Sequence, residues 1–330
     1  PETKPYLYVG SPSGTKDRLV LDIAEAHAAD FATSNEFSLD LTGTEGVETK
    51  EVVVGSVDGT PASFELILGT TTGIKGIQDF FSQIPVDLTV DWDVSSLLTD
   101  LVVLSDMTGA AAAEIMAMKM GSVDSDAISD VVFSTGDYTA VLFGKTGVVF
   151  SDASSLSSWK GDSLISLRKV TTSSYTVTSL EIEDILDTNN NADTVPDILA
   201  GATNGEAVLF EQTADRVFSD EVFLGNDRSS SFSDAPKAYP SPSNYNGGLV
   251  VVADLDGKDK LPAIISGTSI ILNPCSSSPC ASPDWASQTP HTYWEQTVPE
   301  AVAALDLDGD TDLDLVVFPS STLEQPVVIE

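Results

Sequence analysis

The hydrophobic positions of this chain fall into short apolar runs, each of which ends in small or turn-forming residues. Seven such runs are visible, and they begin at Tyr6, Val52, Leu101, Val131, Ile198, Ala263 and Leu315. Short runs rich in Val, Ile and Leu and bounded by Gly, Ser, Thr or Pro are typical of β-strands. The pattern therefore predicts seven equivalent strands.

A second apolar segment follows several of these runs after a short turn, which predicts hairpins at 64–69, 140–144, 207–210 and 269–272. The runs recur on average about every 50 residues, the length of one four-stranded propeller blade. Helical patterns are confined to 22–32 and 109–117, and the Ser-rich stretches 151–163 and 226–248 are expected to be loops. The sequence therefore predicts an all-β fold built from repeats.

The most acidic segment lies directly before the last apolar run. Its five alternating aspartates are Asp306, Asp308, Asp310, Asp312 and Asp314. Alternate residues of an extended strand share one face, so these charges would repel one another unless a cation lay among them. Ca²⁺ takes six to eight oxygen ligands from a flexible loop, and the spacing predicts a calcium loop between strands 301–305 and 315–318. A solvated acidic turn is the plainer alternative.

An EF-hand does not fit this segment. Counting from Asp306, Thr311 stands where that loop needs glycine, and Val317 stands where it needs a bidentate glutamate.

Four further segments carry a related spacing of oxygen-bearing side chains before an apolar run. The first two are Asp187, Asn189, Asn191, Asp193 and Asp197, whose last acid comes two residues late, and Ser122, Asp124, Asp126 and Asp130, which keeps the nine-residue spacing. The other two are Asp91, Asp93 and Asp100, with one extra residue, and Asp254 and Asp256, followed by Lys258. In the last segment the lysine ammonium could replace the ion.

These loops and strands resemble the FG-GAP and VCBS repeats of integrin α-subunit heads and of the T-cell immunomodulatory protein family. The signature of those repeats is D-x-[DN]-x-D-G-x-x-D before an apolar strand, and residues 306–317 match it except at Thr311. The resemblance implies a β-propeller, of seven blades or of six, with Ca²⁺ in the blade loops. It also implies ligation by the side chains of Asp306, Asp308, Asp310 and Asp314 and by the carbonyl of Asp312.

Ring closure removes the exposed strand edges that an open array would present. We therefore expect one domain over residues 1–330, closed by strands from both ends of the chain.

The chain carries 51 acidic and 15 basic residues, a formal net charge of −36. Such a field repels nucleic acid and anionic membranes, so neither is an expected partner. A saline habitat is an alternative cause of the acidity. No run approaches the roughly 20 apolar residues of a membrane helix, and no apolar leader follows Pro1. We expect a processed part of a longer secreted or surface-exposed precursor.

No catalytic constellation is visible in the sequence. His27 and His291 are far apart and lie in no nucleophile or zinc motif, and the paired carboxylates follow the calcium spacing. Trp285 and Trp294 could stack on a glycan. The sequence predicts a non-enzymatic adhesion, interaction or assembly module, extracellular or at the cell surface, that binds a protein or glycan through its loops. The alternatives are a structural subunit of an extracellular filament or surface coat and a carbohydrate-active enzyme of polysaccharide-lyase type.

The only two cysteines, Cys275 and Cys280, are predicted to form a disulfide, because a five-residue separation through Pro and Ser suits a small loop in an oxidising compartment. A metal pair is the alternative. Mass spectrometry of a non-reduced digest should find the two residues linked, and alkylation of both in the unreduced native protein would contradict the pairing. Because the closed loop is short, reduction should change the local loop more than the melting temperature.

Overall fold

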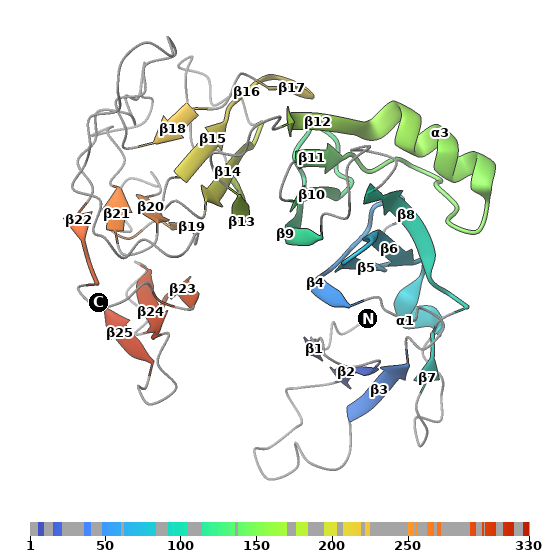
Figure 1. Ribbon diagram of the computed structural model, residues 1–330, viewed down its shortest axis with the longest axis horizontal. Coiled ribbons are helices and arrows are strands. Elements are labelled where there is room, and N and C mark those ends of the chain that lie inside the picture. The colour runs from blue at the N-terminus through green and yellow to red at the C-terminus, as the bar shows by residue number, and fades with distance from the viewer. Residues whose placement is uncertain are drawn as a thin grey trace. The chain divides into compact units, whose positions relative to one another are not determined.

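In the residues that the computed structural model describes, shown in Figure 1, the regular structure is mostly β-strand. The residues that the structure describes are 6–9, 16–21, 36–40, 48–60, 63–83, 92–94, 96–104, 114–135, 138–169, 176–183, 195–202, 207–218, 222–224, 250–253, 255, 263–266, 269–271, 291–294, 299, 301–307, 313–319 and 326–329. Two helices, α1 (Phe80–Gln83) and α3 (Ala153–Ser163), accompany the strands within these ranges. The predicted all-β character is confirmed.

The described strands form five four-stranded sheets, one three-stranded sheet and one two-stranded ribbon. The first sheet has the order β1-β2-β3-β7, with β1 (Tyr6–Val9), β2 (Lys16–Leu21), β3 (Glu36–Asp40) and β7 (Trp92–Asp93). The second has the order β4-β5-β6-β8, with β4 (Thr49–Gly55), β5 (Glu65–Thr70), β6 (Gly73–Ile77) and β8 (Thr99–Val103). The third contains β9 (Ile115–Gly121), β10 (Asp130–Thr135), β11 (Tyr138–Leu142) and β12 (Leu164–Lys169) in chain order.

The remaining sheets follow along the chain. The fourth has the order β13-β14-β15-β18, with β13 (Val177–Glu183), β14 (Asp197–Ala202), β15 (Ala207–Phe210) and β18 (Val222–Leu224), and the ribbon pairs β16 (Gln212–Ala214) with β17 (Val217–Phe218). The fifth contains β19 (Val250–Ala253), β20 (Ala263–Ser266), β21 (Ser269–Ile271) and β22 (His291–Thr292). The last contains β23 (Ala301–Leu305), β24 (Asp314–Phe318) and β25 (Val327–Ile329).

Antiparallel pairing joins the neighbouring strands of the second, fourth, fifth and last sheets. In the first sheet, β3 and β7 are parallel. The recurring unit is therefore a small antiparallel sheet whose strands are mostly consecutive in the chain.

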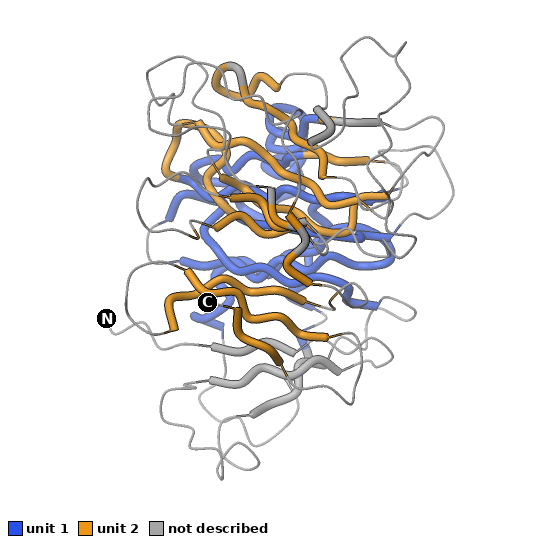
Figure 2. Tube along the Cα trace, turned by 90° about the vertical axis from the view of Figure 1, so that its left-hand side faces the viewer, with its two compact units in different colours: residues 1–120, 128–136, 141–165 blue, residues 121–127, 137–140, 166–330 orange. Residues whose placement is uncertain are grey.

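Two compact units divide the chain, as coloured in Figure 2. Unit 1 comprises residues 1–120, 128–136 and 141–165, and unit 2 comprises residues 121–127, 137–140 and 166–330. The core of unit 1 includes Leu66, Leu68, Ile77, Phe80 and Val94. In unit 2, one cluster joins β14, β15, β19 and β20, and another joins β19, β20, β23 and β24 around Trp294.

The seven predicted strands exist, but they are not equivalent, so that part of the prediction is wrong. The runs at Tyr6 and Val52 form first strands of their sheets, and the run at Leu101 forms the last strand, β8. The other four runs belong to second strands, β10, β14, β20 and β24. A strand that is covered on both faces is apolar wherever it lies in its sheet, so an apolar run does not reveal its position.

The predicted loop at 151–163 is also wrong, because helix α3 occupies most of it. Asp152 caps the helix by accepting a hydrogen bond from the Ser154 amide, and Leu156 and Trp159 are buried. The Trp159 indole donates to the Phe143 carbonyl at 2.6 Å. A cap and these anchors outweigh the low helix propensity of the serines. Of the two helical patterns, 22–32 lies outside the described residues, and 115–117 lies in strand β9.

The end strands β1 and β25 lie in different sheets, since β1 pairs with β2 and β25 pairs with β24. Closure of a ring by these two sheets remains a prediction. Among the described residues, no helix is both long and apolar enough to cross a bilayer.

Candidate functional site

Four sheets place an acidic residue at the first position of their second strand. Glu65 begins β5, Asp130 begins β10, Asp197 begins β14 and Asp314 begins β24. All four are buried, with exposed fractions of 0%, 0%, 2% and 5%. Burial of a carboxylate is costly unless hydrogen bonds compensate it.

Each of these carboxylates accepts a backbone hydrogen bond. The donors are the amides of Val57 for Glu65 at 2.8 Å, Gly144 for Asp130 at 2.8 Å, Gln212 for Asp197 at 2.9 Å and Leu307 for Asp314 at 2.9 Å. The acid therefore fastens a neighbouring loop to the head of a central strand. For three of the four, this acid is the last residue of a predicted metal loop.

The 306–314 segment joins β23 to β24, as predicted, and Leu305 pairs with Asp314 across the two antiparallel strands. Asp306 and Leu307 are exposed, whereas Asp314 is buried and closes the segment through the Leu307 amide. Asp308, Asp310 and Asp312 lie outside the described residues.

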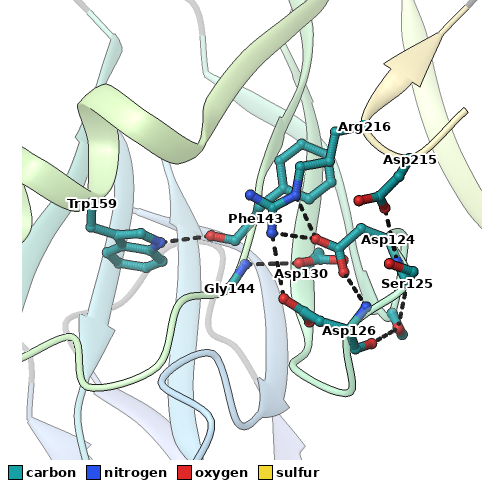
Figure 3. A network of polar contacts seen from close by, with 10 residues as sticks. Asp124, Ser125, Asp126, Asp130, Phe143, Gly144, Trp159, Asp215 and Arg216 are labelled. Carbon is teal, nitrogen blue, oxygen red and sulfur yellow. Dashed lines mark hydrogen bonds and ion pairs between the residues drawn. The ribbon is translucent and has the colours of Figure 1, made fainter.

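The 122–130 segment is described completely, and it forms a compact turn between β9 and β10 (Figure 3). The Ser122 hydroxyl donates to the carbonyls of Asp124 at 3.2 Å and Asp126 at 2.8 Å. The Asp126 amide donates to Asp124 Oδ1 at 2.9 Å. The predicted acids of this turn are therefore close together, in a turn held by its own hydrogen bonds.

A cationic side chain meets the acids of this turn. Arg216, from the tip of the β16–β17 ribbon, donates from Nε to Asp124 Oδ2 at 2.7 Å, and its guanidinium also reaches Asp126 Oδ2 at 3.4 Å. The adjacent Asp215 accepts a hydrogen bond from the Ser125 amide at 3.0 Å. The Asp124 side chain is 1% exposed, so its charge is almost completely removed from water.

The other predicted site residues are less well grouped. Asp100 lies in β8, where it pairs with Lys75 of β6 at 2.5 Å, and Asp93 lies in β7. Residues outside the described ranges are Asp91, Asp187, Asn189, Asn191, Asp193, Asp254, Asp256, Cys275, Cys280 and Trp285. Within the described ranges, no group of three or more His, Cys, Asp or Glu residues is arranged to hold a metal ion. Trp294 is buried against Val302 and Leu315, so its interpretation as a glycan-stacking platform is wrong.

Sequence reasoning missed Asp215, Arg216 and Gln212, because spacing arguments see only neighbours along the chain and these residues act on a turn some 90 residues away. A usable signal exists. The tetrapeptide Ala-Val-Leu-Phe occurs at both 140–143 and 207–210, which marks β11 and β15 as equivalent strands. An alignment on that repeat would have placed Gln212, Asp215 and Arg216 directly after a strand equivalent to β11.

Neither a comparison with models of known protein families nor one with curated proteins gives a match. Among solved structures, the chain is similar to the V. cholerae biofilm matrix protein Bap1, with 15% identity, a TM-score of 0.45 and coverage of 86% of this chain and 38% of that one. It is also similar to the yeast heterotrimeric Nup82-Nup159-Nup116 nucleoporin complex, with 8% identity, a TM-score of 0.41 and coverage of 98% of this chain and 86% of that one. The chain thus spans less than half the length of the first of these proteins.

Glu65 provides a test of the buried acids by pH. Burial raises the pKa of Glu65 above its ordinary value, and this effect exceeds the lowering caused by the hydrogen bonds from Val57 and Ser63. The folded protein therefore holds the Glu65 proton at pH values where the unfolded chain has released it. The stability contributed by this proton is present below the ordinary Glu pKa and is lost as pH rises through the raised pKa.

Urea denaturation of wild type and Glu65→Gln at pH values from the ordinary to the raised pKa of Glu65 should show whether this proton stabilises the folded protein. We expect the free energy of unfolding of wild type to fall relative to that of the Gln variant as pH rises from about 4.3, the ordinary Glu pKa. Glu48→Gln, at a half-buried position in the same unit, is the control. A wild-type advantage that grows with pH would contradict the raised pKa.

Proposed function

We propose that this chain is a calcium-stabilised β-propeller of the FG-GAP/VCBS type that acts as an extracellular adhesion, interaction or assembly module without catalytic activity. The observation that carries the proposal is a repetition. Small antiparallel sheets follow one another along the chain, and several begin their second strand with a buried acid directly after an acidic segment.

The donor set of the 306–314 segment fits Ca²⁺. Carboxylate and carbonyl oxygens are the ligands that this ion prefers, and the segment offers five aspartates between two paired strands. Asp306, Asp308, Asp310 and Asp314 would hold the ion with their carboxylates, and Asp312 would do so with its carbonyl. The Leu307 amide already fixes one oxygen of Asp314, which would orient the carboxylate as an outer partner orients a metal ligand.

The charge of the chain supports a binding role of a particular kind. At −36 the module repels polyanions, so the partner surface that we propose is a basic or uncharged protein or glycan. An ion in the 306–314 loop would lower the repulsion between neighbouring aspartates and so stabilise the loop in one shape. A loop of fixed shape is a better contact surface than a flexible one, because less ordering entropy is lost on binding.

Calcium removal should destabilise the protein, because an ion that binds only the folded state stabilises it by mass action. At free calcium about 100-fold above Kd, the gain is about 2.7 kcal/mol. EDTA should lower the melting temperature by several degrees, and Mg²⁺ should restore little of it, because Mg²⁺ prefers a tighter and more hydrated octahedron.

The double variant D308N/D310N should melt like chelated wild type and respond little to EDTA. Asp162→Asn, an exposed acid on helix α3, is the matched control and should keep the full calcium response. An unchanged wild-type midpoint in EDTA, together with no calcium by elemental analysis, would remove the calcium claim.

The binding role is tested by cross-linking and capture from the native surface, with wild type and D308N/D310N as parallel baits. We expect wild type to retain a partner in calcium and to lose it in EDTA, and the variant to capture none in either buffer. Recovery of further copies of the same chain alone would favour the structural filament or coat. Equal capture by both baits would contradict a calcium-dependent module.

A further inference from the structure

The turn at 122–126 already contains a cation that belongs to the protein. The Arg216 guanidinium contacts carboxylate oxygens of both Asp124 and Asp126, with Nε to Asp124 Oδ2 at 2.7 Å and the terminal nitrogen to Asp126 Oδ2 at 3.4 Å (Figure 3). These two acids occupy the third and fifth places of the predicted calcium spacing. All three residues belong to unit 2.

The electrostatics of the turn favour such a cation. The Asp124 side chain is 1% exposed, and a buried carboxylate is stable as an anion only when it is paired and hydrogen-bonded. The planar guanidinium offers several N–H donors in a fixed fork, so one arginine can serve two carboxylates at once. The turn therefore has a counter-charge that reaches both acids.

The rest of the ribbon tip is shaped to hold the arginine there. Asp215 accepts a hydrogen bond from the Ser125 amide at 3.0 Å. Two consecutive residues of the ribbon, one acidic and one basic, therefore contact the turn. The buried Gln212 amide fits its surroundings when its nitrogen donates to the Val123 carbonyl at 2.9 Å and its oxygen accepts from the Arg216 amide at 3.0 Å. The turn and the ribbon are thus joined at three points.

The backbone of Arg216 gives independent support. Its φ is +59°, in the left-handed region that favours glycine and where other residues are uncommon. Glycine would relieve this strain, yet the sequence has arginine. The contacts that the Arg216 side chain makes with Asp124 and Asp126 offset part of this backbone cost.

We propose that Arg216 is the resident cation of the 122–130 segment and takes the place of a divalent ion there. This segment then binds no Ca²⁺, and the contact between the β9–β10 turn and the β16–β17 ribbon does not depend on calcium. The inference stands on the contacts of Arg216 and is independent of calcium binding at 306–314.

Substitution of Arg216 tests the inference, because the two possibilities predict opposite changes in the melting temperature of the glycine variant. If the side chain is unimportant, Arg216→Gly relieves a strained turn and leaves the melting temperature in EDTA unchanged or higher. If Arg216 is the cation, the same variant removes the counter-charge of the buried Asp124 carboxylate, and the melting temperature should fall by several degrees. Arg216→Lys keeps the charge at the same backbone strain and should lose less than Arg216→Gln.

A double-mutant cycle separates this effect from general damage to the ribbon. Asp124→Asn removes the carboxylate that R216Q leaves without its arginine partner. D124N should therefore cost less stability in the R216Q background than in wild type. Equal costs in the two backgrounds, or an R216G variant as stable as wild type, would overturn the proposal.

Metal stoichiometry supplies a second test, whose readout is the number of bound ions and not the melting temperature. Titration with Ca²⁺ alone should give the same number of bound ions for wild type and for D124N/D126N, and the loss of one equivalent in the variant would overturn the proposal. If wild type binds no calcium at all, the proposed function fails. The melting temperatures of the Arg216 variants in EDTA still decide the role of Arg216 in that case.

Discussion

The buried carboxylate at the head of a second strand is the interaction on which the repeating sheets depend. Strands β5, β10 and β14 are buried along their whole length, and each begins with an acid that has almost no contact with water. Such a residue is tolerated only where donors reach it, and the donors here are the backbone amides of adjacent loops and, for Asp197, of strand β16. The acid thus sets where the strand begins and where the loop crosses it.

The acids of the predicted metal loops obtain positive charge in different ways. Three of the four buried acids come directly after segments that carry further acids. The structure gives two different partners inside the protein, since Lys75 pairs with Asp100 in one sheet and Arg216 contacts Asp124 at another turn. A metal ion at 306–314, as we propose, would be a third way to satisfy the same requirement. The repeat fixes the place of the acids, and the source of the positive charge differs from one loop to another.

Much of the fold could be predicted from the sequence, because a buried strand has a local signature. The bounds 301–305 agree with β23, and 315–318 lies within β24. Equivalence between strands could not be predicted from the apolar runs alone, since first, second and last strands have the same apolar pattern. Helix 153–163 was hidden by its serines, and its anchors, Leu156 and Trp159, were visible only as isolated apolar residues.

The limits of prediction at the candidate site have a different cause. The spacing of Asp124, Asp126 and Asp130 located a real turn, but the counter-charge of that turn comes from a residue 92 positions away from Asp124. The spacing of residues shows which oxygen atoms a loop contains. It gives no information about the charged side chains that a distant hairpin places beside that loop. A motif of acids therefore predicts a need for positive charge more securely than it predicts a metal.

The source of the positive charge decides which parts of unit 2 respond to their surroundings. A calcium ion at 306–314 would exchange with solvent, so the junction of β23 and β24 would loosen when free calcium falls. The Arg216 guanidinium is covalently part of the chain, and its charge is retained at all physiological pH values. Its junction therefore remains assembled when a chelator is added. The two arrangements together would let a module that is acidic throughout respond to calcium at one sheet while keeping another turn in place.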